Sequence, residues 1–381
     1  MSCNIDNSSD RSSDLKDSEP DLPEGVPPLR SLYLYISGSC NLACRHCWIT
    51  PTYQARGNGG RFIKLEHVEK AIREARPLGL RTVKLTGGEP MLHPQFKEIV
   101  RLIDDEDLNI QIETNGTLID DDLAKFLKQT ERVSFVSVSV DGAEAESHEY
   151  MRGVPGCFES AVDGIRKLVK QGFRPQLICT LHKGNTSELE KVIELAGTLG
   201  CGSVKFNHVQ QVGRGEQFSE EKGLKVPEII SLYQRIENDL IPKSKIPLHF
   251  DIPFAFYPIR KLLDDQLGRC TVRNILGILS GGELSLCGIG VSIPELIYGQ
   301  IEKDSLREVW CNNPGLVQLR EEIPERLEGI CGDCLHRDLC LGHCVANNFH
   351  VSGKLNVPYQ FCYIAEQSGL FPASRKRIIA N

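Results

Sequence analysis

The sequence contains no apolar run long enough to cross a membrane. Its longest apolar stretches have the length of single strands, and the first residues lack the apolar segment of a secretory signal. The net charge is −7, and no basic stripe of the kind that binds nucleic acid is visible. We therefore expect a cytoplasmic globular protein that binds neither membranes nor nucleic acid.

Basic and apolar residues are scarce in the first 29 positions. Residues 1–29 carry seven acidic and two basic side chains and are rich in Ser, Asp and Pro, which predicts a disordered acidic tail. The rest of the chain is close to neutral. A chain of 381 residues is long enough for one large domain and a smaller one.

Cysteine, by contrast, is abundant, with 15 residues. In a chain without a secretory signal, this number indicates a reducing compartment and metal ligation rather than disulfides. Cys40, Cys44 and Cys47 follow the apolar run 32–36, which predicts a loop at the end of a first strand. Thiolates are the usual ligands of iron–sulfur clusters, and three of them leave one iron of a cubane open. A zinc site would need a fourth ligand, and His46 is awkwardly wedged between two of the cysteines.

Short β-prone runs alternate with amphipathic helical stretches from about residue 31 to 240. Such repeated βα units predict a parallel sheet with right-handed crossovers, and six of them fit a partial barrel whose functional groups gather at the C-terminal ends of the strands. The predicted strands are 32–36, 82–86, 110–113, 133–140, 176–181 and 204–208, and the predicted helices include 119–127, 161–170, 189–199 and 227–238.

Polar residues follow the ends of these strands. The turn 86–90 (Thr-Gly-Gly-Glu-Pro) lets the backbone approach a ligand and supplies a carboxylate acceptor, although alone it also fits a plain tight turn. Short polar side chains suit a ribose or an amino-acid group, and the alternative for the serines is core hydroxyls bonded to the backbone. Arg152 could bind the carboxylate of a ligand, and the alternative is that it forms an ion pair on the surface. The candidates are Gly87, Gly88, Glu89, Asn115, Ser137, Ser139, Asp141 and Arg152.

A second group of cysteines begins at about residue 268. Gly282 stands five residues before the second of them, and the spacing of the later members is strongly typical of metal binding. Two zinc knuckles are the alternative, which His336, His343 or His350 would complete. The cysteines are Cys270, Cys287, Cys331, Cys334, Cys340, Cys344 and Cys362.

These motifs together resemble the radical S-adenosylmethionine (radical SAM) enzymes with a C-terminal SPASM extension, over residues 31–362. The resemblance implies that Cys40, Cys44 and Cys47 bind a 4Fe-4S cluster whose open iron holds SAM. It further implies that the Gly-Gly-Glu turn binds the SAM amino group, that Ser139 and Arg152 contact its carboxylate, and that residues 209–215 are a candidate adenine pocket.

The resemblance also implies two auxiliary 4Fe-4S clusters, three clusters in all. The outer one would be bound by Cys331, Cys334, Cys340 and Cys362, and the inner one by Cys270, Cys287 and Cys344. Residues 271–286 contain no further cysteine, so the inner cluster keeps an open iron or recruits an unexpected ligand. The segment 306–310 matches the helix that precedes the cysteine run in this extension.

We therefore expect a tail over 1–29, a radical SAM barrel over 30–240, a linker over 241–267, a SPASM domain over 268–365 and a C-terminal tail over 366–381. Four cysteines remain outside these sets. Buried small apolar residues are the plain interpretation of them, but epimerising relatives use a free cysteine as a hydrogen-atom donor. They are Cys157, Cys179, Cys201 and Cys311.

By resemblance, the enzyme cleaves SAM to a 5′-deoxyadenosyl radical, and the expected reaction is thioether or carbon–carbon crosslinking of a ribosomally made peptide. A one-electron donor such as ferredoxin or flavodoxin is expected. Residues 1–29 are too short and polar for a leader-binding domain, so a peptide would dock on the barrel or through a separate partner. The alternatives are peptide epimerisation, sulfatase maturation and porphyrin or other small-molecule chemistry. An iron–sulfur electron-transfer protein or a zinc scaffold is the non-enzymatic alternative.

Overall fold

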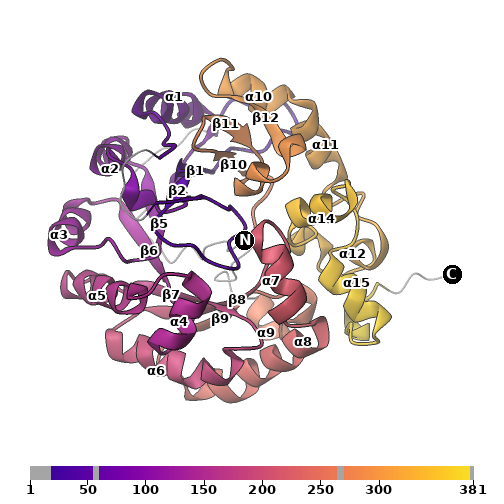
Figure 1. The fold of residues 1–381 in the computed structure, drawn as a ribbon. Coiled ribbons are helices and arrows are strands. Elements are labelled where there is room, and N and C mark those ends of the chain that lie inside the picture. The colour runs from indigo at the N-terminus through magenta and orange to yellow at the C-terminus, as the bar shows by residue number, and fades with distance from the viewer. Residues whose placement is uncertain (1–18, 55–59, 264–269, 378–381) are drawn as a thin grey trace.

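The computed structural model describes residues 19–54, 60–263 and 270–377 (Figure 1). Residues 1–18 of the predicted tail lie outside the described residues, but the rest of that tail is packed against the body. Leu29 is fully buried, and the carbonyl of Pro27 accepts a hydrogen bond of 2.9 Å from Trp310 Nε1. The prediction of disorder is therefore wrong for residues 19–29, because Leu22, Val26 and Leu29 supply an apolar face that the body covers.

A ten-stranded sheet forms the centre of the protein, in the order β12-β11-β10-β1-β4-β5-β6-β7-β8-β9. All neighbours from β10 to β9 are parallel, and the six predicted strands are present as β1, β4, β5, β6, β7 and β8. The α/β fold with a partial barrel is thus confirmed. The strands are β1 Ser31–Ser37, β4 Thr82–Gly87, β5 Asn109–Thr114, β6 Val133–Ser139, β7 Gln176–Leu181, β8 Ser203–His208, β9 Leu248–Phe250, β10 Ile275–Ile278, β11 Glu283–Ser285 and β12 Ile297–Gln300, and a separate pair consists of β2 Ser39–Cys40 and β3 Thr52–Tyr53.

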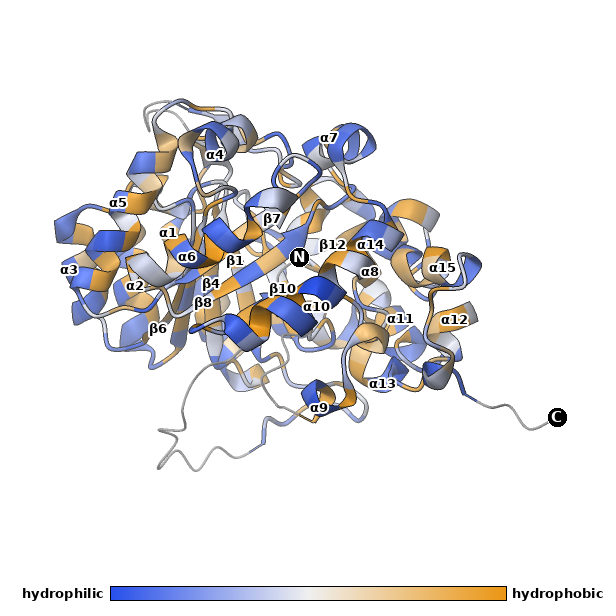
Figure 2. Cartoon of the chain, turned by 90° about the horizontal axis from the view of Figure 1, so that it is seen from below, coloured by the Kyte–Doolittle hydropathy of each residue, from blue (hydrophilic) through white to orange (hydrophobic). Residues whose placement is uncertain are grey.

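Helices surround the outer face of the curled sheet and turn their apolar sides toward it (Figures 1 and 2). On α2, for example, Phe96, Ile99, Val100 and Ile103 recur at helical spacing and are all buried. The helices of the barrel are α1 Leu65–Ala75, α2 Phe96–Asp105, α3 Asp121–Gln129, α4 Ala145–Arg152, α5 Cys157–Lys170, α6 Leu189–Leu199, α7 Arg214–Lys222, α8 Val226–Arg235 and α9 Ile259–Leu262. Helices α4 and α7, which the sequence analysis did not predict, both lie beside the site described below.

The segment 241–267, predicted as a linker, contributes a strand to the sheet. Its strand β9 pairs in parallel with β8. The chain then returns to the opposite edge, where β10 pairs in parallel with β1, and β11 and β12 follow in antiparallel order. The cysteine-rich region therefore continues the sheet of the barrel. Its three strands were missed because each has only three or four residues.

The C-terminal region ends in short helices, which lie together at the right of Figure 1. They are α10 Leu306–Asn312, α11 Pro314–Glu322, α12 Gly329–Gly332, α13 Arg337–Cys340, α14 Val345–Ser352 and α15 Gln360–Gln367. Much of the predicted tail after residue 365 is also packed, since Phe371 is buried and Arg375 Nη2 donates to the carbonyl of Tyr257 at 3.1 Å. Residues 378–381 lie outside the described residues. Within the described ranges, no helix is long and apolar enough to cross a membrane.

Candidate active site

The loop that carries Cys40, Cys44 and Cys47 lies over the C-terminal end of the sheet, as predicted. Backbone hydrogen bonds hold it against the end of α4, from Ala43 N to Arg152 O at 3.0 Å and from Arg45 N to Met151 O at 2.9 Å. Cys40 and Cys44 are buried, and burial raises the pKa of Cys40 to about 12. A metal that binds this thiol therefore has to displace its proton.

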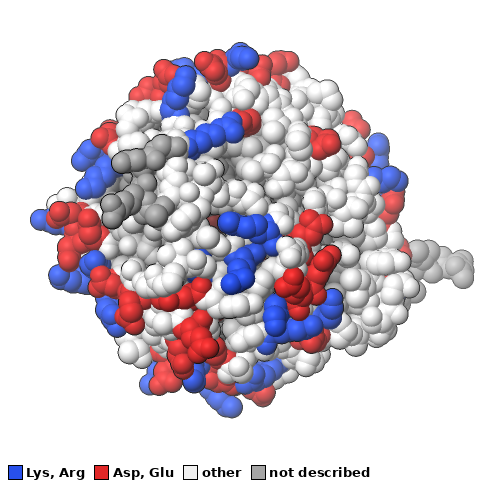
Figure 3. Space-filling model, in the orientation of Figure 1, with Lys and Arg blue, Asp and Glu red and all other residues white. Residues whose placement is uncertain are grey.

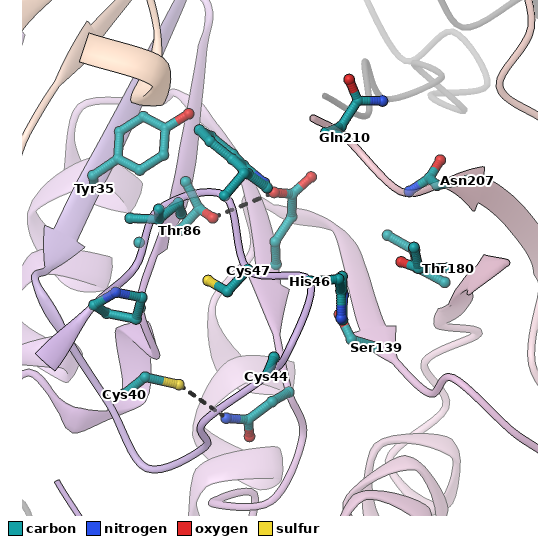
Figure 4. Close-up of a pocket in the computed structure, with 18 of the residues that line it drawn as sticks. Tyr35, Cys40, Cys44, His46, Cys47, Thr86, Ser139, Thr180, Asn207 and Gln210 are labelled. Atoms are coloured by element: carbon teal, nitrogen blue, oxygen red, sulfur yellow. Dashed lines mark hydrogen bonds between the residues drawn. The ribbon is translucent and has the colours of Figure 1, made fainter. Parts of the chain in front are cut away.

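Donors surround the sulfur atoms of this loop. The backbone N–H of Leu42 lies 3.4 Å from Cys40 Sγ, and Asn115 Nδ2 lies 3.9 Å from the same atom (Figure 4). Arg152 Nη1 lies 3.7 Å from Cys44 Sγ. Sulfur atoms that accept hydrogen bonds and have a cation nearby are well suited to be thiolate ligands of an iron–sulfur cluster. Asn115 also donates to Asn41 Oδ1 at 2.8 Å, so this predicted site residue braces the loop.

The Gly-Gly-Glu turn packs against the same loop. Gly88 N donates to Ser37 O at 2.7 Å and Glu89 N to Ser39 O at 2.8 Å. A Cβ on Gly88 would lie 2.1 Å from the Ser39 carbonyl oxygen, so only glycine fits there. The glycines therefore let two backbone segments meet, and both also line the cavity described below.

Glu89 is placed differently from the expectation of a direct ligand contact. Its side chain is fully buried behind the cavity wall and accepts hydrogen bonds from Thr114 Oγ1 at 2.7 Å and Asn115 N at 2.8 Å. Burial raises the pKa of Glu89 to about 7, although these two hydrogen bonds oppose the rise. The carboxylate thus fixes the ends of β4 and β5 relative to each other.

A buried ion pair lies under the loop. Arg152 Nε is 2.8 Å from Asp141 Oδ2, and the other carboxylate oxygen of Asp141 accepts from Thr180 N at 2.8 Å. Burial alone would raise the pKa of Asp141, but Arg152, His46 and the hydrogen bond from Thr180 together outweigh it, and the pKa lies below its ordinary value. Asp141 is fully buried and does not line the cavity, whereas Arg152 does. The structure therefore places Asp141 behind Arg152 rather than beside a ligand.

The two predicted serines of β6 also differ. Ser139 lines the cavity. Ser137 is buried one pleat deeper, and its hydroxyl lies 3.5 Å from the carbonyl of Ile112. For Ser137 the structure thus favours the alternative of a core hydroxyl.

One cavity joins these groups, with an empty volume of about 1350 Å³ when its open mouth is included. The cysteine loop forms one side, while Thr180, Asn207 and Gln210 face it from the ends of β7 and β8 (Figure 4). Of the candidate adenine segment 209–215, Gln210 and Arg214 line this cavity. Other residues that line the cavity belong to none of the motifs recognised in the sequence, among them Tyr35, Lys84, Glu113, Thr180, Asn207 and His208.

Two cysteines of the C-terminal group line the same cavity, namely Cys270 and Cys287. Tyr35 stands near both of them. Burial raises the pKa of Tyr35, and the neighbouring Cys287, Glu113 and Cys270 raise it further. The pairing of β10 with β1 brings this region to the cavity, so thiols about 240 residues apart in sequence share one wall.

Comparison with known families gives two matches in order along the chain. The model of the radical SAM superfamily matches residues 34–196, and that of the SPASM iron–sulfur cluster-binding domain matches residues 270–335. The chain is a radical SAM enzyme with a SPASM domain. Membership in these families indicates that it uses SAM and a 4Fe-4S cluster.

Several named relatives align over most of this radical SAM chain. The AdoMet-dependent heme synthase of Methanosarcina barkeri (strain Fusaro / DSM 804) is 29% identical over 86% of the chain and 94% of the relative. The mycofactocin maturase MftC of Mycobacterium ulcerans (strain Agy99) is 27% identical over 85% of both. In fold, Streptococcus suis SuiB bound to precursor peptide SuiA has a TM-score of 0.71 at 15% identity, over 88% of this chain and 76% of SuiB. The structure titled native anSMEcpe with bound AdoMet and Cp18Cys peptide has a TM-score of 0.65 at 18% identity, over 90% and 98%.

Four thiols of the SPASM region lie near one another, as expected for the ligands of an outer cluster. Cys362 lies in electrostatic reach of Cys331, Cys340 and Cys334, and its pKa is raised by Cys331 and by burial. Backbone N–H groups donate to two of these sulfurs, from Tyr359 to Cys331 at 3.3 Å and from His336 to Cys334 at 3.4 Å. The four thiols therefore fit a cluster site. Cys344 is the N-cap residue of α14 and does not line the cavity, and its place in an inner set with Cys270 and Cys287 stays a prediction.

Zinc would need ligands that converge on one ion. Within the described residues, no three His, Cys, Asp or Glu side chains do so. The thiolates of a cubane also surround one centre, but each binds a different iron, so they lie farther apart than the ligands of a single ion. None of the four candidate hydrogen donors lines the cavity, since Cys157, Cys179, Cys201 and Cys311 are all buried, but Cys157 belongs to the same buried cluster as Cys40 and Cys44 of the loop.

Proposed function

We propose that this radical SAM enzyme oxidatively modifies a ribosomally made peptide by forming a thioether or carbon–carbon crosslink. The observation that carries the proposal is the shared cavity, in which the cluster loop and the SPASM cysteines Cys270 and Cys287 line the same space. A substrate in this cavity would be next to both the source of the radical and a one-electron acceptor. This arrangement favours a net oxidation over a redox-neutral reaction.

The residues that would hold the first cluster are Cys40, Cys44 and Cys47, and Arg152 with Ser139 would face the SAM carboxylate. When bound, the cluster and SAM supply a 5′-deoxyadenosyl radical that takes a hydrogen atom from the substrate. The surrounding residues orient the ligands. Glu89 fixes the strand ends, Asp141 holds Arg152, and the buried wall of the sheet excludes water.

A peptide substrate is supported by the mycofactocin maturase and subtilosin AlbA relatives, and by the likeness in fold to SuiB. Epimerisation is less well supported, because none of the four free cysteines lines the cavity within the described residues. A second candidate substrate is a porphyrin, which is favoured by the heme synthase and Fe-coproporphyrin III synthase relatives over 86% and 88% of the chain.

The test is anaerobic turnover of the reconstituted enzyme with SAM. Dithionite would stand in for a one-electron donor such as ferredoxin or flavodoxin. The candidate substrates are peptides encoded by short reading frames beside the gene, with Fe-coproporphyrin III in a parallel reaction. The proposal predicts that a peptide loses two hydrogens while 5′-deoxyadenosine forms. A peptide whose mass is unchanged after turnover in H₂O and which gains one deuterium in D₂O would indicate an epimerase instead, and turnover of the porphyrin alone would favour the second candidate.

A further inference from the structure

Arg214, the first residue of α7, has buried guanidinium nitrogens without partners. Its side chain lines the cavity, and its Nε and Nη2 atoms are buried and have no hydrogen-bond partner among the described residues. No carboxylate within the described ranges lies in ion-pair range of it. The side chain as a whole is half-buried, but two buried donor nitrogens without partners are unfavourable and therefore indicate a ligand that this side chain can receive.

The other two cations of the cavity wall are already neutralised. Arg152 pairs with Asp141, and Lys84 Nζ lies 3.2 Å from Glu113 Oε1. Arg214 is therefore the cavity cation for which a negative partner has to come from outside the described part of the chain. Figure 3 shows Lys and Arg side chains near the centre of this face, next to its central hollow.

The backbone holds Arg214 in place. Gly213 has a φ of +61°, and a Cβ at this position would lie 2.7 Å from the carbonyl oxygen of Trp48. This turn lets the N–H of Arg214 donate to the carbonyl of Cys47 at 3.0 Å. The backbone of Arg214 is thus held beside the cluster loop. A ligand that binds the guanidinium has to order only the side-chain torsions of this residue.

Amide groups also line this cavity. Asn207 and Gln210 point into the cavity from the side opposite Cys40 and Cys47 (Figure 4). Asn207 Oδ1 is also buried without a hydrogen-bond partner. A planar cation and amides that line one cavity suit an acid group, because a guanidinium binds a carboxylate through two parallel hydrogen bonds and the amides can bond other polar groups of the same ligand.

We propose that Arg214 binds a carboxylate of the substrate and thereby selects substrates that carry an acid group in this cavity. The inference rests on the proposed function, in which the substrate enters the shared cavity. Both candidate substrate classes can supply the group, a peptide through an acidic side chain and a coproporphyrin through its propionates. The carboxylate would lie within reach of Arg214, whose backbone is held beside the cluster loop.

The experiment compares binding by the reconstituted wild-type enzyme, Arg214→Gln and Arg214→Lys, with Arg166→Gln on the exposed side of α5 as a matched control. One arm uses Fe-coproporphyrin III and its tetramethyl ester, followed by the Soret band. The other arm uses two synthetic hexapeptide libraries that differ only in a fixed Glu or Gln, followed by equilibrium dialysis. The wild type should prefer the acid form in one arm by roughly tenfold or more, the effect of one charge-assisted hydrogen bond.

That preference should vanish in Arg214→Gln, persist in part in Arg214→Lys and be unchanged in Arg166→Gln. The arm that shows it identifies the source of the carboxylate. The inference is overturned if the wild type has no acid preference in either arm, or if the preference survives in Arg214→Gln. It is also overturned if Arg214→Gln instead weakens SAM binding tenfold or changes only the cluster reduction potential. Failure of the proposed function would appear in the wild-type product masses, independently of these binding ratios.

Discussion

Replacement of Arg152 by glutamine should separate the structural role of this residue from its role toward SAM. Arg152 pairs with a fully buried Asp141 at 2.8 Å and faces the cavity beside Cys44. The substitution leaves Asp141 as an unpaired buried carboxylate, which destabilises a protein by about 3–5 kcal/mol. It also removes a charge-assisted contact to the SAM carboxylate of about 1.5–3 kcal/mol, equivalent to a roughly 10- to 100-fold rise in Kd.

The double variant Asp141→Asn with Arg152→Gln distinguishes the two effects. A neutral amide no longer needs the cation, because replacing both partners of a buried pair is often nearly neutral. We therefore expect the apparent urea midpoint to recover most of its loss, while the affinity for SAM stays as low as in Arg152→Gln. Anaerobic urea titration and equilibrium dialysis of SAM on the reconstituted protein measure these two quantities.

Decarboxylated SAM is the ligand control, because it differs from SAM in the one group that Arg152 is expected to contact. Its Kd should change by less than about threefold in Arg152→Gln, well below the 10- to 100-fold change for SAM. An equal loss for both ligands would refute the assignment of Arg152 to the carboxylate. Recovery of SAM binding in the double variant would refute it as well.

Three further predictions concern the loop, the buried histidines and the outer thiols. Gly88→Ala should lower the iron content and the urea midpoint, because the new Cβ would lie 2.1 Å from a backbone oxygen, whereas Gly197→Ala has open space within α6 and should lower neither. His148 Nδ1 accepts a backbone N–H at 3.1 Å, and burial lowers its pKa to about 4. Below pH 6.5 the unfolded chain therefore binds more protons than the folded one. The urea midpoint of the wild type should fall as the pH is lowered from 6.5 to 4, and it should fall by less in His148→Gln. An equal fall of the urea midpoint with pH in both proteins would contradict this. Cys334→Ser should remove about four irons per chain, and an unchanged iron content would exclude Cys334 as a ligand.

Local patterns in the sequence predicted most of the strands and helices of the barrel. Strand and helix positions followed from apolar periodicity, and the predicted bounds of β7 and α6 match the structure. The strands β9 to β12 could not be found in this way, because each has three or four residues and is defined by a partner far away in sequence. The packing of residues 19–29 was hidden by their polar composition, since only a few apolar side chains such as Leu29 anchor them.

The segments that form the candidate site could be predicted from the sequence, but which of their side chains line the cavity could not. Ser137, Ser139 and Asp141 were all expected at the end of the fourth predicted strand, and only Ser139 of the three lines the cavity. Which of them lines the cavity depends on where the strand ends and on the ion pair that Asp141 forms with Arg152, and neither can be read from the local sequence. Arg214 was not recognised as an unpaired cation, because the absence of a partner can be seen only in three dimensions.

The most direct test of the central claim is to measure iron, sulfide and zinc together with 5′-deoxyadenosine after anaerobic reconstitution. Three cubanes predict about twelve irons per chain with matching sulfide. The triple variant Cys40→Ala, Cys44→Ala, Cys47→Ala should lose about four of these irons and all reductive cleavage of SAM. Zinc without iron in the wild type, or equal 5′-deoxyadenosine formation by the triple variant, would contradict the account.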